Sequence, residues 1–350
     1  MESRIIFSQY PDRELEALIS RFQRDKIFLL TEETPDRFCL PVMETFSERH
    51  GIRKIVIPGG EMNKSVESVV RVWEFLSQSG ADRKSLLINT GGGMLTDLGG
   101  FAASTFKRGI AFVNIPTTLL AQVDASIGGK TGINFNGLKN EIGVFREPDA
   151  VLIHTGFLKT IDRENFLSGY AEMIKHGLIK SPEHWHELQE YDPEHPDYEK
   201  LEQIIGHSVD IKKWHVLNDP TEKNIRKALN FGHTAGHAFE SHALHKGKPI
   251  LHGYAVAYGM IAELYLSFKK TGFGKPELES IAQWLRGQYG RYAVTEEDYM
   301  PLYELMTHDK KNEGARINFT LLSSVGRAVI DQDCTKELIF EAFDYYRSLE

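Results

Sequence analysis

Between residues 26 and 116, short apolar runs rich in β-branched residues alternate with longer amphipathic runs. This alternation predicts βαβ units, in which parallel strands form a sheet covered by helices and the ligand binds at the carboxyl ends of the strands. The expected strands are 27–30, 55–57, 86–89 and 111–115, and the expected helices are 35–50, 65–80 and about 95–106. The first half therefore predicts a Rossmann-like α/β layer.

Two glycine-rich turns, 58–64 and 90–97, follow the second and third expected strands. Glycines here let backbone N–H groups approach a phosphate at the start of the next helix. The second turn lacks the third glycine of the dinucleotide fingerprint and follows the third strand, so an ordinary Rossmann assignment does not fit and a tight structural turn remains the alternative. Glu32 and Glu33, at the end of the first strand, are the carboxylates nearest to where an adenosine ribose would be held.

Three bases, Arg108, Lys130 and Lys139, lie in a stretch that is otherwise small, apolar or hydroxylic. The whole chain has 41 basic and 49 acidic residues and a net charge of −8, which predicts repulsion of nucleic acid and anionic membranes. Cations beside glycines in such a chain indicate a local anion pocket, and three solvated surface bases are the alternative.

His233 and His237 are four residues apart, one turn of a helix. Their imidazoles would leave one face, kept open by Gly232 and Gly236, where a metal, a substrate or both could bind; the alternative is a pair of histidines on a helix surface. The HExxH protease scheme is excluded because no glutamate lies between them. Of the other histidines, His184, His186 and His195 are predicted to be solvated loop residues.

After an expected strand at 150–154 the pattern changes to helical periods, which predicts a domain boundary near 155–160. A short strand pair is expected within 316–330 and a closing helix over 335–349. The two cysteines, Cys39 and Cys334, are too few for a disulfide framework or a Cys-based zinc site. With no signal-peptide core and no apolar run long enough for a membrane helix, a cytoplasmic protein is expected.

Three segments, GGGMLTDLGGFAASTFKRGI, PTTLLAQVDASIGGKTGIN and LKNEIGVF, strongly resemble the 3-dehydroquinate synthase family, and the likeness covers roughly residues 25–330. The resemblance implies a Rossmann-like NAD-binding α/β domain, 1–157, and an all-α metal- and substrate-binding domain, 158–350. It also implies a phosphorus–oxygen lyase of the shikimate pathway. Such an enzyme converts 3-deoxy-D-arabino-heptulosonate 7-phosphate to 3-dehydroquinate and phosphate by transient NAD-dependent oxidation, phosphate elimination, reduction and intramolecular aldol closure.

The same resemblance implies a site for one divalent metal, Zn²⁺ or Co²⁺, with Glu172, His233 and His252 as ligands. Two histidines and one carboxylate with an open position form a catalytic zinc arrangement. His237 is then free for substrate binding and proton transfer. Beside His252, this chain has Tyr254 where many relatives carry Glu.

The remaining site residues are implied in three groups. Further catalytic residues are Asp124, Lys130, Lys175, Arg226 and Asn230. Further substrate-binding residues are Arg108, Asn140, Lys212, Lys310 and Lys311, with Lys213 as the alternative to Lys212 and with Lys311 slightly preferred to Lys310. The NAD⁺-binding residues are Gly59, Gly60, Glu61, Met62, Asn63, Lys64, Gly93, Met94, Leu95, Thr96, Asp97, Thr117, Thr118, Lys130, Lys139, Phe157, Leu158, Lys159 and Thr160.

Three alternatives remain open. A related cyclase acting on sedoheptulose 7-phosphate would lack the cations that meet a carboxylate, and a metal-dependent polyol dehydrogenase has no need of VDASIGGKTGIN. The third is a catalytically inactive binding protein on the same fold. The family further implies a homodimer, with Arg108 reaching into the neighbouring subunit's site, and neither a nucleic-acid nor a membrane partner.

Overall fold

The computed structural model describes residues 3–136, 138–307 and 317–349. The chain forms two compact units, Met1–Asp162 with Asp197–Glu202, and Arg163–Pro196 with Gln203–Glu350. The predicted functional boundary at 157/158 falls within the 3-10 helix η6 (Thr155–Thr160), a few residues before the first unit ends. Among the described residues, every helix is too short or too polar to cross a membrane.

The first unit is built on a parallel sheet of six strands in the order β1-β8-β5-β4-β2-β3. Its strands are β1 (Arg4–Phe7), β2 (Ile27–Glu32), β3 (Arg53–Ile57), β4 (Leu86–Gly91), β5 (Ala111–Pro116) and β8 (Ala150–Ile153). This confirms the parallel α/β layer, and the five expected strands correspond to β2, β3, β4, β5 and β8. The edge strand β1 is additional.

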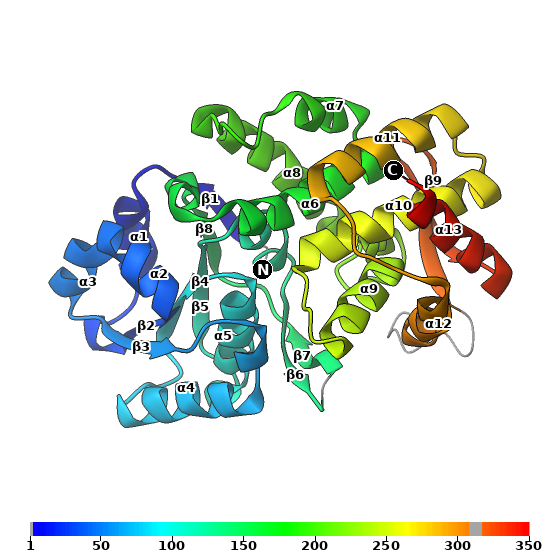
Figure 1. Cartoon of the computed structure of the whole chain (residues 1–350). Helices are drawn as coiled ribbons and strands as arrows, with labels where there is room; N and C mark the ends of the chain where they lie inside the picture. The colour runs from blue at the N-terminus through cyan, green and yellow to red at the C-terminus, as the bar shows by residue number, and fades with distance from the viewer. Residues whose placement is uncertain (1–2, 137, 308–316, 350) are drawn as a thin grey trace. The chain divides into compact units, whose positions relative to one another are not determined.

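Residues of one strand alternate between the two faces of this sheet, and both faces are covered (Figure 1). Ile27 and Leu29 pack with α1 (Pro11–Ile19) and α3 (Glu44–His50). Phe28 and Leu30 pack with α4 (Val66–Gln78) and α5 (Gly93–Thr105) on the other side. Burial on both faces explains why consecutive residues of these strands, as in 27–30 of β2, are apolar instead of alternating with polar residues.

The first predicted helix, 35–50, is not continuous. It divides into α2 (Glu33–Phe38), the 3-10 helix η2 (Leu40–Met43) and α3. Pro41 lies at the break, where it has no N–H to donate and its ring collides with the preceding turn. The long amphipathic pattern therefore predicted correctly where helical structure occurs, but it wrongly predicted one uninterrupted helix.

The glycine-rich basic stretch forms two elements that its sequence pattern does not predict. The first is a π-helical turn, η5 (Ala121–Ala125), and the second is an antiparallel hairpin of β6 (Lys130–Phe135) and β7 (Leu138–Phe145). β6 packs against α5, where a Cβ on Gly100 would come within 2.5 Å of the Thr131 methyl carbon. Glycine at that position lets the hairpin lie directly on the helix.

The second unit is helical, with one antiparallel strand pair. Its elements are α6 (Arg163–Lys180), α7 (Pro182–Glu190), α8 (Tyr198–Asn218), η7 (Ile225–Asn230), α9 (His233–His245), α10 (His252–Thr271), α11 (Lys275–Tyr289), η8 (Glu296–Asp298), α12 (Tyr299–Thr307), β9 (Asn318–Ser324), β10 (Arg327–Asp333) and α13 (Lys336–Ser348). The expected strand pair and closing helix are β9–β10 and α13. His184 and His186 lie on α7, so their prediction as loop residues is wrong, and His184 is buried.

Three helices of this unit meet at glycines. The N–H of Gly253 on α10 donates to the Ser168 hydroxyl on α6 at 3.0 Å, and a Cβ on Gly253 would lie 1.9 Å from the Ser168 carbonyl oxygen. A Cβ on Gly259 of α10 would lie 2.0 Å from the carbonyl oxygen of Gly232, just before α9. The backbones of α6 and α9 thus approach α10 without intervening side chains.

Candidate metal centre and glycine-rich turns

Glu172, in the middle of α6, is fully buried beside two histidines and a lysine. Its Oε1 lies 3.4 Å from Nε2 of His233 and 3.5 Å from Nε2 of His252, and its Oε2 forms an ion pair with Lys175. Burial alone raises the pKa of Glu172, but the charges of Lys175 and His233 hold it well below its ordinary value. The carboxylate is therefore ionised at neutral pH.

The outer nitrogens of the two histidines are held by other groups. Nδ1 of His233 lies 3.1 Å from the Phe231 carbonyl oxygen, and Nδ1 of His252 lies 3.3 Å from Oε2 of Glu240. Partners of this kind fix the ring orientation and direct Nε2 inward. Burial alone lowers the pKa of His252, whereas hydrogen bonds to Glu172 and Glu240 raise it to about 10.

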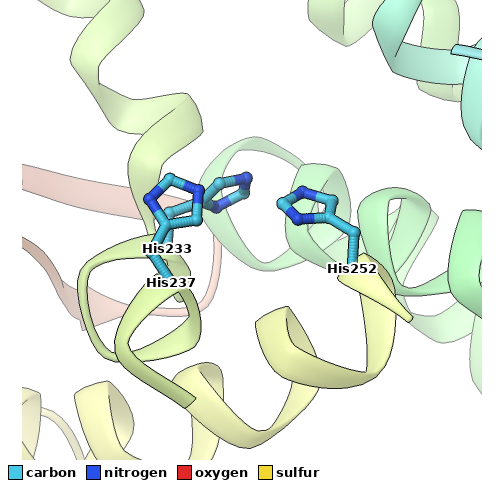
Figure 2. A group of neighbouring side chains, drawn as sticks. All are labelled: His233, His237 and His252. Atoms are coloured by element: carbon cyan, nitrogen blue, oxygen red, sulfur yellow. The ribbon is translucent and has the colours of Figure 1, made fainter. Parts of the chain in front are cut away.

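His237 joins the same group from the next turn of α9. Figure 2 shows the imidazoles of His233 and His237 on the side of α9 that faces His252. The ring centres of His237 lie 5.4 Å from His233 and 5.9 Å from His252, and one nitrogen from each of the three lies within 4.8 Å of the others. The expected one-turn pairing of His233 and His237 on a helix is confirmed.

These residues fit a divalent metal. A buried, ionised carboxylate faces two Nε2 atoms, which lie 3.4 Å and 3.5 Å from its Oε1. Nitrogen and carboxylate oxygen ligands in this number suit Zn²⁺ or Co²⁺. Two overlapping ligand sets are available around His233 and His252, one completed by Glu172 and the other by His237.

Arg226 and Asn230 do not lie on the helical face of His233, although their four-residue spacing equals about one helical turn. They belong to the 3-10 helix η7, and the chain reverses at Gly232, whose φ is +79°, before α9 begins at His233. Glycine adopts a positive φ without a steric cost, and this conformation at Gly232 separates η7 from α9. The Asn230 side chain donates to Oε1 of Glu222 at 2.8 Å.

A residue without any sequence signal supports the start of α9. Glu263, buried on α10, accepts hydrogen bonds from the N–H groups of Gly232, at 2.6 Å, and Ala235, at 3.0 Å. The first N–H groups of a helix have no partner within it, so a carboxylate from another helix satisfies them and favours the positive end of the dipole. Only the tertiary structure brings these residues together.

Several basic side chains that are predicted to bind substrate are buried in this unit, whereas isolated bases of a protein usually lie exposed on its surface. Lys175, Lys212 and Arg226 are almost fully enclosed, whereas Lys213 is half-buried. Burial and the nearby charges of Lys180, Lys175 and Lys212 lower the pKa of His215 to about 4. Lys175 and Lys212 therefore both contribute positive charge near His215. The predicted substrate lysines Lys310 and Lys311 lie outside the described residues.

In the first unit, the two glycine turns meet at the carboxyl ends of β2, β3 and β4. Oε1 of Glu32 accepts a hydrogen bond from the N–H of Gly92 at 3.1 Å, and a Cβ on Gly59 would lie 2.8 Å from its Oε2. Burial raises the pKa of Glu32, although the N–H groups of Gly92 and Gly60 act in the opposite direction. A single carboxylate thus links both turns at the edge where ligands of such sheets bind.

Lys64, Asp97 and Asn140 converge beside these turns. Nζ of Lys64 lies 2.6 Å from Oδ2 of Asp97 and also contacts Oδ1 of Asn140. Desolvation raises the pKa of Asp97 despite the ion pair with Lys64. Elements far apart in the sequence therefore supply one polar cluster.

The other predicted residues of this unit differ in exposure. The N–H of Thr117 donates to Gly91 at 2.9 Å, and Thr118 lies beside Gly92. Met62 is 85% exposed, whereas Phe157 and Leu158 are buried in the 3-10 helix η6. The exposed predicted bases are Arg108, Lys130, Lys139 and Lys159.

Residues 54–168 match the family model for 3-dehydroquinate synthase N-terminal, and residues 169–312 match that for 3-dehydroquinate synthase C-terminal. The chain belongs to the 3-dehydroquinate synthase family. The family resemblance in its sequence is thereby confirmed.

Curated relatives cover nearly the whole chain. It is 50% identical over 346 residues to a 3-dehydroquinate synthase from Parabacteroides distasonis, covering 99% of this chain and 98% of the relative. A 3-dehydroquinate synthase from Streptococcus sanguinis is 39% identical over 326 residues, covering 91% and 90%.

Solved structures share the fold at lower identity. A 2-epi-5-epi-valiolone synthase from Streptomyces hygroscopicus subsp. jinggangensis 5008, with NAD⁺ and Zn²⁺ bound, has a TM-score of 0.87 and 24% identity, covering 100% of this chain and 98% of that chain. A 2-deoxy-scyllo-inosose synthase complexed with carbaglucose-6-phosphate, NAD⁺ and Co²⁺ has a TM-score of 0.84 and 24% identity, covering 99% and 96%. The predicted fold class is confirmed.

Proposed function

We propose that this chain is a 3-dehydroquinate synthase, which converts 3-deoxy-D-arabino-heptulosonate 7-phosphate to 3-dehydroquinate and phosphate. The observation that carries the proposal is the buried group of Glu172, His233 and His252 beside the enclosed cation Lys175. It lies in a chain that is 50% identical to a curated 3-dehydroquinate synthase over nearly its full length. The proposed functional domains are 1–157 and 158–350.

The cofactors are one divalent metal and NAD⁺. Glu172, His233 and His252 hold the metal, because two Nε2 atoms face a single buried carboxylate oxygen. When bound, the metal acidifies a hydroxyl and NAD⁺ accepts and returns a hydride. Structural relatives solved with NAD⁺ and with Zn²⁺ or Co²⁺ support this choice.

The residues of this chain bind, orient and exchange protons. His237 lies one turn from His233 and takes and returns protons on the substrate, a task suited to an imidazole. Bases meet the phosphate and carboxylate of the substrate. Lys175, Lys212 and Arg226 among them are enclosed, and a desolvated cation attracts an anion strongly. The substrate-facing bases are Arg108, Lys130, Lys175, Lys212, Arg226, Lys310 and Lys311, and the hydroxyl-binding residues are Asp124, Asn140 and Asn230.

NAD⁺ binds along the glycine turns of the first unit. Backbone N–H groups at the start of α5, after Gly92, would hold the pyrophosphate of the cofactor. Glu32 joins both turns and is positioned for the ribose hydroxyls. The predicted cofactor residues, from Gly59 to Lys64 and from Gly93 to Asp97, flank this carboxylate.

A cytoplasmic homodimer is part of the proposal. All residues of β7 are exposed, and they include the apolar side chains of Leu138, Ile142, Val144 and Phe145. An exposed apolar edge strand favours pairing with another chain. The family resemblance further implies that Arg108 reaches the partner's site.

The deciding experiment is turnover of the heptulosonate phosphate by purified protein with NAD⁺ and Zn²⁺ or Co²⁺, followed by phosphate release and product analysis. We expect 3-dehydroquinate and phosphate in equal amounts, without net NADH. Equal turnover of sedoheptulose 7-phosphate would assign the chain to a cyclase acting on that sugar. Net NADH from polyols would assign it to a dehydrogenase, and absence of any turnover with metal bound would indicate a binding protein.

A further inference from the structure

A second cluster of metal-ligating side chains lies on α7 and α8, in residues to which the proposed function gives no role. Nδ1 of His184 lies 3.1 Å from Oε2 of Glu187, and Nδ1 of His207 lies 2.9 Å from the same oxygen. One ligand atom from each of the three lies within 4.8 Å of the others. Two imidazoles and a carboxylate are thus already gathered around one point.

The local structure explains this gathering. His184 and Glu187 are three residues apart near the start of α7, so they share one face. His207 projects from α8 toward that face, and its ring lies 6.1 Å from the ring of His184. The ligands therefore come from two helices and not from a single flexible loop.

The distances suit a small divalent ion. Two ligands of a tetrahedral zinc ion, each about 2.0–2.1 Å from the metal, lie roughly 3.3 Å apart. The contacts around Glu187 need to widen by only a few tenths of an ångström to reach this spacing. Imidazole and carboxylate ligands favour Zn²⁺ and neighbouring transition ions over Mg²⁺ or Ca²⁺.

The cluster is accessible from solvent. It lines a surface pocket of about 420 Å³ together with Asp210, which follows His207 by one turn of α8. His184 is only 3% exposed, and its Nε2 has no hydrogen-bond partner among the described residues.

We propose that His184, Glu187 and His207 form a second metal site that binds one Zn²⁺ or a similar transition ion and joins α7 to α8. Water completes the coordination from the open side of the pocket. The alternative is a hydrogen-bonded cluster in which Glu187 accepts from both imidazoles. In the metal site the imidazoles lose the protons that they donate to Glu187 when the metal binds. In the hydrogen-bonded cluster those protons stay in place.

The position of the cluster gives the ion a structural role. α7 begins two residues after α6 ends, and a Cβ on Gly177 of α6 would lie 2.8 Å from the backbone nitrogen of Trp185. α6 and α7 are therefore packed backbone to backbone. An ion between α7 and α8 would stabilise the packing around the helix that carries Glu172.

The number of bound ions tests the proposal. Protein stripped by a chelator is dialysed against Zn²⁺ or Co²⁺, and bound metal is counted by mass spectrometry. We expect two equivalents for the wild type, one for His207→Ala and one for His233→Ala, which lacks a ligand of the first site. His207 is 58% exposed, so this substitution leaves the fold intact. The control His195→Ala removes a fully exposed imidazole and should keep two equivalents.

Affinity and thermal stability give independent measurements. In the His233→Ala background, Glu187→Gln should weaken the remaining site at least tenfold, and Zn²⁺ should raise Tm only while His207 is present. Turnover by His207→Ala with the first site filled should match the wild type. One equivalent in the wild type, or unchanged binding in His207→Ala, would overturn the second site. If wild-type protein with two equivalents of metal bound showed no turnover, that result would instead count against the proposed function.

Discussion

The buried carboxylate of Glu263 on α10 accepts a hydrogen bond from the backbone N–H of Gly232, the residue immediately before His233. The same carboxylate also accepts from Ala235. A carboxylate eleven residues after His252 on α10 thereby fixes where α9 starts and where the His233 imidazole leaves it.

Glu263→Gln should destabilise the protein and weaken metal binding. The amide has one oxygen in place of two, so one buried N–H loses its acceptor, at a cost of roughly 1–3 kcal/mol. Urea unfolding of the metal-free protein measures the first effect, and metal dialysis the second. The control Glu304→Gln, exposed on α12, should change stability by less than about 0.5 kcal/mol. Equal midpoints for both variants would contradict the capping role.

The ligand set can be separated by single substitutions. His233→Ala and His252→Ala should each abolish retention of the first metal, whereas His237→Ala should retain it and lose about 10²–10⁴-fold in rate. Metal content and turnover are measured on the same preparations, in the His207→Ala background to leave one site. If His237→Ala emptied the site while Glu172→Gln did not, His237 and not Glu172 would be the third ligand.

Glu240→Gln tests the outer partner of His252. The carboxylate lies 3.3 Å from Nδ1 and increases the basicity of the ring. Its neutral analogue should lower metal affinity roughly 10–100-fold while the ligands remain in place. A competition assay with a chromogenic chelator measures the affinity, and wild-type affinity would show that the contact does not orient His252.

Metal binding at the first site should release protons. The pKa of His252 in the metal-free protein is about 10, so this imidazole is protonated at pH 7 and must lose its proton to become a ligand. Apparent affinity should therefore increase with pH up to about 10. Calorimetric titration of His207→Ala in two buffers of different ionisation enthalpy counts the protons, and identical heats would contradict the expectation.

The raised pKa of His252 also affects the stability of the metal-free protein, which should decrease with pH while metal affinity increases. Because the folded pKa is raised above the ordinary value of 6.5, His252 stabilises the metal-free protein fully below about pH 6.5. This contribution is lost as the pH rises toward 10. Unfolding midpoints measured with a chelator present should therefore fall over this interval, and the fall should be smaller in His252→Gln.

Gly253→Ala tests the helix crossing. The new Cβ would lie 1.9 Å from the Ser168 carbonyl oxygen, so the helices must separate, and we expect a loss of at least about 1–3 kcal/mol together with weaker metal binding. The matched control is Gly287→Ala on α11, where a Cβ meets nothing within 4 Å. That change should increase stability by up to about 1 kcal/mol. Equal effects of the two substitutions would exclude a tight crossing.

The alternation of strand and helix patterns predicted five of the six strands in the sheet of the first unit. Buried strands such as β8 are apolar along their whole length, and turn residues mark where they end. Local patterns failed where one residue decided continuity, as Pro41 does at the start of η2, just after α2 ends. The hairpin β6–β7 was not predicted because its glycines, including Gly132 opposite Gly143, resemble a loop in composition.

For the site, residue type and spacing predicted that His233 and His237 share a face, and the family resemblance supplied Glu172 and His252. Neither approach could find Glu263, because its role depends on α10 lying against the start of α9. The cluster at Glu187 was also missed, since its third member comes from a different helix. Contacts between distant segments become visible only in three dimensions.

The glycine crossings at Ser168 and Gly232 limit how the metal centre can accommodate ions of different radius. Main chains already in contact cannot move closer, and moving them apart would break the bond from Gly253 to Ser168. A larger ion would therefore have to be accommodated by rotation of the Glu172 and histidine side chains alone. Selectivity among divalent ions should accordingly depend on size as well as on ligand chemistry, and should relax when the crossing is loosened.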